Sequence, residues 1–150
     1  MEIRIIICGS RKFNDYEFLK EKVTDIISII REKTEELKGI HLDKDTPIRI
    51  ISGRAAGADT LGEKYAKEFG YELSLFPAEW DRYGKYAGLM RNGDMAKFAC
   101  EYDNFPVIIG FKCGPSHGTT HMLSLGNKYG FPWVLHFDYV EKEEVPFYDK

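Results

Sequence analysis

Five short, uninterrupted apolar runs constrain the fold of this chain more than any other feature. Because the runs are continuous rather than alternating, they are typical of strands that are covered on both faces of a parallel sheet. The runs are Ile3 to Cys8, Ile48 to Ile51, Leu73 to Phe76, Val107 to Phe111 and Trp133 to Phe137. The sequence therefore predicts five strands of a mainly parallel sheet.

Segments with helical spacing separate these runs, so strand and helix alternate from end to end. The stripes consist of Leu19, Val23, Ile26, Ile27 and Ile30, then Leu61, Tyr65 and Phe69, then Met95, Phe98, Ala99 and Tyr102, then Met122, Leu125 and Tyr129. With right-handed crossovers, this order predicts an α/β fold: one Rossmann-like, doubly wound domain over residues 1–150 with helices on both faces of the sheet. Residues from about 141 to 150 form an acidic tail that we expect on the surface.

The composition limits the classes of partner. Lys and Arg number 21 against 24 Asp and Glu, a net charge of −3, whereas broad, charge-driven nucleic-acid binding needs a basic face. The apolar runs fall far short of a membrane span, and Met1 leads directly into the first strand. Three cysteines without C-x-x-C spacing fit a reducing compartment. We expect a cytoplasmic protein with no membrane or nucleic-acid partner, while a homo-oligomer remains open.

Glycine-rich turns follow the first, second and fourth runs and should meet at one edge of the sheet, where ligands of such folds bind. Glycine lets the backbone approach a phosphate, the following helix attracts anions, and hydroxyl and guanidinium groups add donors. From these turns we predict as ligand-binding residues Gly9, Ser10, Arg11, Gly53, Gly57, Asp59, Ser116, Gly118, Thr119 and Thr120. At the start of a helix, Asp59 is more often an N-cap than a catalyst, and the functional alternative is a contact with the ribose of the ligand.

The sequence indicates neither of two common nucleotide-binding motifs, the Walker A loop and G-x-G-x-x-G, and it indicates no metal centre. No G-K-[ST] follows the turns, and none has G-x-G-x-x-G spacing, so NAD redox chemistry is not predicted. His117 and His121 are four residues apart, but Gly118 places His117 before the helix, and no third ligand is evident. We therefore expect no metal and no certain cofactor, and either histidine could donate to a phosphate.

The turn after the third run, residues 79–92, combines aromatic, charged and glycine residues. Trp80 and Tyr83 could stack on a base, while Arg91 and Asn92, expected at a helix start, could hold phosphate or ribose. We expect this segment to close over the ligand; the alternative is that Trp80 and Tyr83 plug the end of the sheet. Glu79 and Asp81 are the candidates for a catalytic acid or base, although loop carboxylates are usually solvated.

These motifs occur in a specific order: Cys8-Gly9-Ser10-Arg11, Ser52 to Asp59, Ala78-Glu79-Trp80-Asp81 through Gly84, Ala87-Gly88 with Arg91-Asn92 and Met95, and Ser116-His117-Gly118-Thr119. Together they resemble the YspA-like (cpYpsA-related) branch of the SLOG superfamily over residues 3 to 134. The resemblance implies a Rossmann-like fold with the ligand above the glycine-rich turns. It also implies a binder or processor of nucleotide-derived small molecules, often in phage and prokaryotic conflict systems.

The chain departs from superfamily members that cleave the N-glycosidic bond of nucleoside monophosphates. Their motif is P-G-G-x-G-T-x-x-E; here Gly118-Thr119 is retained, but Met122 stands where the catalytic Glu would be. Arg54 stands where relatives often have a small residue, and points either into the site or to solvent. The first interpretation is thus a sensor or effector that binds a nucleotide or ADP-ribose-like ligand. The alternatives are a nucleotide-processing hydrolase or transferase and a single-stranded DNA-binding module.

Overall fold

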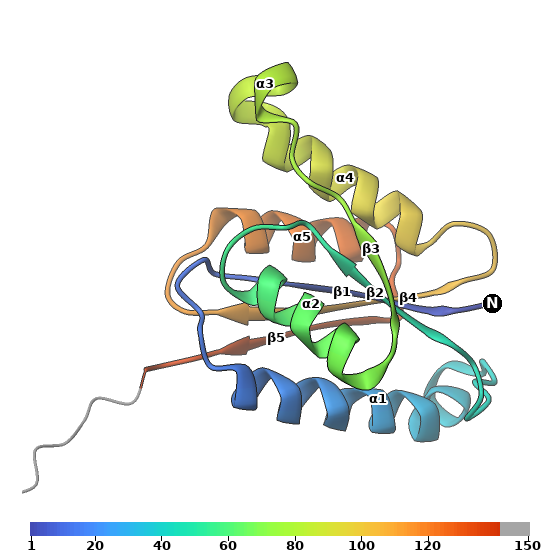
Figure 1. Ribbon diagram of the computed structural model, residues 1–150. Coiled ribbons are helices and arrows are strands. Elements are labelled where there is room, and N and C mark those ends of the chain that lie inside the picture. Colours follow the sequence, from blue (N-terminus) through green and yellow to red (C-terminus); the bar gives the residue numbers. More distant parts are fainter. Residues whose placement is uncertain (142–150) are drawn as a thin grey trace, which may run out of the picture.

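The computed structural model describes residues 1–141 and contains a five-stranded sheet flanked by helices (Figure 1). The elements in chain order are β1 (Ile3–Gly9), α1 (Tyr16–Lys38), β2 (Ile48–Ser52), α2 (Ala58–Phe69), β3 (Glu72–Leu75), α3 (Trp80–Tyr83), the 3₁₀ turn η1 (Gly84–Tyr86), α4 (Ala87–Ala99), β4 (Phe105–Lys112), α5 (His117–Lys128) and β5 (Trp133–Asp138). Nearly all of the predicted acidic tail, residues 142–150, lies outside the described residues.

All neighbouring strands run parallel, in the order β3-β2-β1-β4-β5. In the central strand, Ile5 lies opposite Ile50 of β2 on one side and Val107 of β4 on the other. The predicted α/β class and parallel sheet are confirmed. The chain leaves β1 toward β2 and later crosses back to β4, so strand order reverses between β1 and β4, the usual place for a ligand in an open sheet of this kind.

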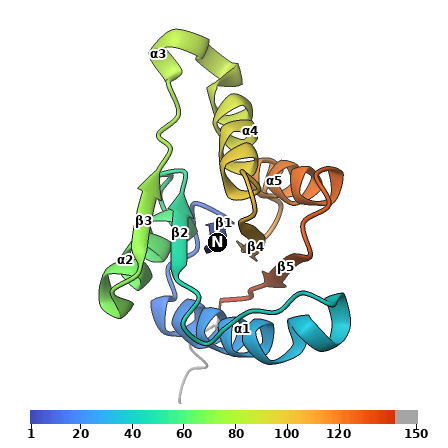
Figure 2. The ribbon, with the colours of Figure 1, turned by 90° about the vertical axis from the view of Figure 1, so that its right-hand side faces the viewer.

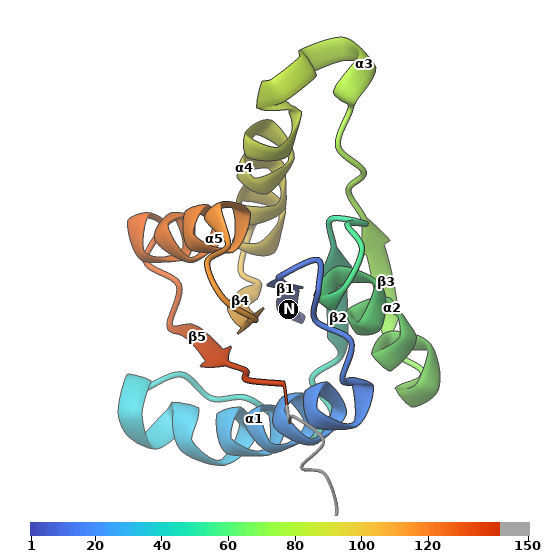
Figure 3. The ribbon, with the colours of Figure 1, turned by 90° about the vertical axis from the view of Figure 1, so that its left-hand side faces the viewer.

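Two apolar cores lie on opposite faces of this sheet, because successive side chains of a strand point to opposite sides. Ile5 and Ile7 of β1 pack with residues of α1 and α2, whereas Ile6 and Cys8 pack with residues of α4 and α5. Figures 2 and 3 show α1 on one side of the sheet and α4 with α5 on the other. Within residues 1–141 no helix has both the length and the apolarity that crossing a bilayer requires.

The region between β3 and β4 differs most from expectation. Helix α4 ends at Ala99, and Tyr102, expected on its apolar stripe, lies in the following turn with φ 58° and an exposed fraction of 89%. Before α4, the short elements α3 and η1 project beyond the sheet (Figures 2 and 3). Elements of four and three residues are too short to leave a helical period in the sequence, so neither was predicted.

Candidate functional site

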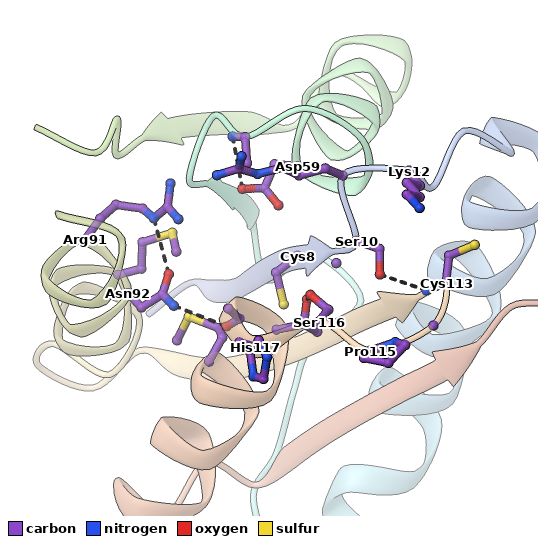
Figure 4. A pocket seen from close by; sticks show the side chains of 18 residues that line it. Cys8, Ser10, Lys12, Asp59, Arg91, Asn92, Cys113, Pro115, Ser116 and His117 are labelled. Carbon is purple, nitrogen blue, oxygen red and sulfur yellow. Dashed lines mark hydrogen bonds between the residues drawn. The ribbon is translucent and has the colours of Figure 1, made fainter. Parts of the chain in front are cut away.

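A cavity of about 560 Å³ opens at the carboxyl ends of β1 and β4, where the strand order reverses. The end of β1, the turns after β1 and β4, and the beginning of α5 supply most of its wall, and α4, α2 and the turn after β2 supply the rest (Figure 4). The sequence predicted this edge of the sheet. Cys8, Lys12, Met95 and Cys113 also line the cavity. They were not predicted, although Lys12 adjoins Arg11 in the sequence and could have been included on that ground.

Two of the predicted glycines allow the turns to pack closely against one another. A Cβ atom on Gly9 would lie 2.1 Å from the carbonyl oxygen of Phe111, in β4. Gly57 has φ 84°, and a Cβ there would lie 2.3 Å from the carbonyl oxygen of Ser10. Because backbone atoms cannot give way at these distances, the close approach of the three turns requires glycine at both positions.

The hydroxyl groups in the cavity wall form hydrogen bonds within the protein. Ser10 is buried, and its Oγ accepts a hydrogen bond of 2.8 Å from the Cys113 N–H, which ties the turn after β1 to the turn after β4. The Ser116 and Thr119 hydroxyls share a hydrogen bond of 2.7 Å. Ser116 occupies the N-cap position of α5, but its side chain makes no capping hydrogen bond, so the first N–H groups of α5 are left for another partner.

Thr120 is placed differently from the other predicted hydroxyl residues. Its side chain accepts a hydrogen bond of 3.2 Å from Lys112 Nζ, and it is not part of the cavity wall.

Three cationic side chains surround the cavity. Arg11 and Lys12 are exposed at its rim, and neither forms a hydrogen bond or ion pair with any other residue of the described range 1–141. Arg91 is partly buried: its Nη1 donates to the Gly53 carbonyl oxygen at 2.6 Å. Burial lowers the pKa of Arg91, the Asp59 carboxylate counteracts this, and the positive charge of Arg11 lowers it further. The two guanidinium groups thus lie near enough to repel each other.

Asp59 is a buried carboxyl group, with an exposed fraction of 4%, in the wall of this cavity. The N-cap expectation is wrong: Gly57 is the N-cap of α2, and Asp59 is the second residue of the helix. Its Oδ2 accepts a hydrogen bond of 3.3 Å from the Ala55 N–H, across the tight turn that begins at Gly53. Burial raises the pKa of Asp59 to about 6, although the Ala55 N–H and Arg91 act in the opposite direction.

Asn92 joins α4 to the beginning of α5. It is buried, and its Nδ2 donates to the Gly118 carbonyl oxygen at 3.3 Å and to His121 Nδ1 at 3.1 Å. Burial lowers the pKa of His121, which favours the neutral ring that can accept this bond. Asn92 Oδ1 accepts from Arg91 Nε at 3.2 Å, so Asn92 also orients that guanidinium. Both residues lie in the second turn of α4, not at its start.

A smaller cavity of about 210 Å³ adjoins the main one and shares Arg11, Ala55 and Arg91 with it. Trp80 forms part of its wall and has an exposed fraction of 50%, so the interpretation of Trp80 as a plug at the end of the sheet is wrong. Arg54, also in this wall, has φ 64° and pairs with Glu63 at 3.6 Å while half of its side chain is in solvent.

The predicted acid–base candidates lie away from the main cavity. Glu79 lines a third cavity, of about 290 Å³, together with Tyr83, so Trp80 and Tyr83 face different spaces. Asp81 is exposed on α3. Among the residues that line the main cavity, Asp59 is the one carboxylate, and Met122, buried at 1%, forms part of the wall. No three His, Cys, Asp or Glu side chains within residues 1–141 gather as a metal site.

Comparison with known proteins gives two matches. Residues 3–83 match the YspA, cpYpsA-related SLOG family, a stretch that includes the turns after β1 and β2 and the segment with Trp80. The Gene 61 protein of Mycobacterium phage D29 is 31% identical to the chain over 93 residues, which cover 59% of this chain and 70% of the phage protein. No solved structure matches the chain.

Proposed function

Since the chain belongs to the YspA, cpYpsA-related SLOG family, we propose that it binds a nucleotide-derived anionic small molecule in the cavity between the ends of β1 and β4. The ligand class is a nucleotide or an ADP-ribose-like compound. One observation carries the proposal: Arg11, Lys12 and Arg91 gather around a cavity whose wall includes the uncapped start of α5. In a chain of net charge −3, such a local cluster of cations favours an anionic ligand.

The start of α5 supplies a phosphate site. Its free N–H groups and helix dipole attract an anion, and Thr119 adds a hydroxyl group in the cavity wall. A Cβ atom on Gly118 would meet no atom within 4 Å, so open space lies above this turn, where a phosphate group can approach the backbone. The guanidinium of Arg11, with no partner in the described part of the chain, can then grip the phosphate from the opposite turn.

The adjoining cavity suits the base or the second half of the ligand. Trp80 offers an exposed aromatic face beside Arg11 and Arg91, and stacking on a base contributes about 1–3 kcal/mol. The segment from Glu79 to Asn92 would close over the ligand and determine its identity. The protein acts as a sensor or effector of this ligand, in a phage or prokaryotic conflict setting that the phage relative supports. The partner is a small molecule rather than nucleic acid.

A nucleotide-processing hydrolase is the second candidate. The observation that favours it is Asp59, a carboxyl group in the cavity wall whose pKa of about 6 suits proton transfer near neutral pH. Met122, in place of the superfamily glutamate, weighs against it. Chromatography of AMP and ADP-ribose after incubation with the protein distinguishes the two, because binding alone leaves the ligands intact.

A thermal-shift titration with AMP, ADP and ADP-ribose tests the binding proposal. A ligand present at about a hundred times its Kd stabilises the fold by about 2.7 kcal/mol, which is a clear rise in Tm. Arg11→Ala should abolish the rise without lowering the Tm of the free protein, since this side chain is exposed and unpaired within residues 1–141. The matched control is Lys97→Ala, which removes one exposed cation on α4 away from the cavity. No rise with any of the three ligands would refute the proposal.

A further inference from the structure

Asp59 stands out among the groups of the cavity wall because it is a carboxylate in a site built for an anion. Its side chain extends toward the cavity from the beginning of α2, opposite Ser116 (Figure 4). No ion pair neutralises it within residues 1–141. The positive charge of Arg91 favours the ionised carboxylate, but its guanidinium donates hydrogen bonds to the Gly53 carbonyl oxygen and to Asn92 instead.

The hydrogen bonds of Asp59 are incomplete. Oδ2 accepts from the Ala55 N–H at 3.3 Å, and the Gly53 N–H also favours the charged form. A carboxylate has about four acceptor positions, so two backbone donors leave room for two more. Burying an ionised group with unfilled acceptor positions is unfavourable. Because Asp59 lies in the wall of the cavity, a ligand in the cavity can fill these positions.

The charges around the cavity restrict what can fill those positions. A second anionic group would be repelled by Asp59, and a cationic group would be repelled by Arg11, Lys12 and Arg91. Neutral hydroxyl donors satisfy both conditions. Two adjacent hydroxyl groups, as in the 2′,3′-diol of a ribose, can both donate to one carboxylate, while the phosphate of the same molecule binds at the start of α5.

We infer that Asp59 recognises the vicinal hydroxyl groups of the ligand sugar, which makes the site selective for ribonucleotides over ligands that lack these groups. The inference rests on the proposed nucleotide site and adds the sugar class to it. Asp59 thereby acts as a specificity-determining residue, and its position on α2 places the sugar between the phosphate site on α5 and the cavity that Trp80 lines.

Isothermal titration of AMP and 2′,3′-dideoxy-AMP into the wild-type protein tests this directly, because the two ligands share base and phosphate and differ only in the diol. We expect AMP to bind at least tenfold more tightly. In Asp59→Asn the preference should fall below threefold, since the amide accepts more weakly and presents an N–H donor. A role of Asp59 in shaping the turn alone would weaken both ligands equally and leave the preference intact.

Glu63→Gln is the matched control: Glu63 is a buried carboxylate one turn further along α2, bonded to Ser52 at 2.7 Å and outside the cavity wall. This variant should keep the tenfold preference. Equal binding of the two ligands to the wild-type protein would overturn the inference and leave the proposed function standing. Absence of binding by both, in a protein that also gives no thermal shift with ADP-ribose, would overturn the two together.

Discussion

Replacing Asp59 with asparagine should stabilise the free protein at neutral pH, and the structure gives the magnitude. The pKa of this buried carboxyl group is about 6 in the folded protein, against a reference value of 3.8. At a pH between these two pKa values, Asp59 keeps its proton in the folded state but has lost it in the unfolded state. The stability contributed by Asp59 is therefore fully present below about pH 4 and is lost as pH rises through 6. Two pKa units correspond to about 3 kcal/mol.

Asparagine preserves the acceptor for the Ala55 N–H and the volume of the side chain, but it does not ionise. Relative to wild type, Asp59→Asn should thus gain up to about 3 kcal/mol in free energy of unfolding between pH 4 and pH 7.5. Urea unfolding at several pH values across this interval measures the gain. Asp81→Asn, which removes an exposed carboxylate from α3, is the control and should have little effect at any pH. A difference between Asp59→Asn and wild type that is constant with pH, or that favours wild type as pH rises, would refute the reasoning.

Three further predictions concern the turns, the aromatic segment and the choice of partner. Gly57→Ala should lower the free energy of unfolding in urea by several kcal/mol, because φ is 84° and the new Cβ would lie 2.3 Å from a carbonyl oxygen. Gly118→Ala, with open space around it, should fold normally but bind ADP-ribose at least tenfold more weakly in calorimetry. Trp80→Ala should lose about tenfold in ADP-ribose affinity with little change in Tm, because the side chain is half exposed; unchanged affinity would exclude its role in stacking. A single-stranded oligonucleotide should bind weakly and lose affinity steeply with salt in fluorescence anisotropy, so tight binding at physiological salt would favour the DNA-binding alternative.

The strands could be predicted closely because a buried parallel strand has an uninterrupted apolar pattern. The expected run Ile3 to Cys8 corresponds to β1 at Ile3–Gly9, and Trp133 to Phe137 corresponds to β5 at Trp133–Asp138. The start of β4 was placed two residues late because Pro106 interrupts the pattern. Pro106 is tolerated there because it is paired with β1 only: the pairing with β5 begins at the next residue, so its missing N–H breaks no bond on that side.

The edge of the sheet that carries the main cavity was predictable, but the position and contacts of each residue around it were not. Turn composition predicted Gly9, Gly57 and Asp59 as ligand-binding residues at this edge. It could not reveal that Gly57 packs beneath the turn after β1, or that Asp59 is buried, since both depend on how closely turns distant in sequence approach. Trp80 and Tyr83 are three residues apart in one segment, yet the projecting α3 directs them into different cavities.

The paired contacts of Arg91 and Asn92 have a consequence for cooperativity. Arg91 bonds to Gly53, in the turn after β2, and its neighbour Asn92 bonds to Gly118, in the first turn of α5. Helix α4 therefore bonds to both sides of the cavity, in addition to the direct pairing of β1 with β4. If the proposed ligand fills this cavity and contacts both sides, its binding should slow local opening on both. In native-state hydrogen exchange, amides near Gly53 and amides in the first turn of α5 should gain protection together, although more than sixty residues separate them in the chain.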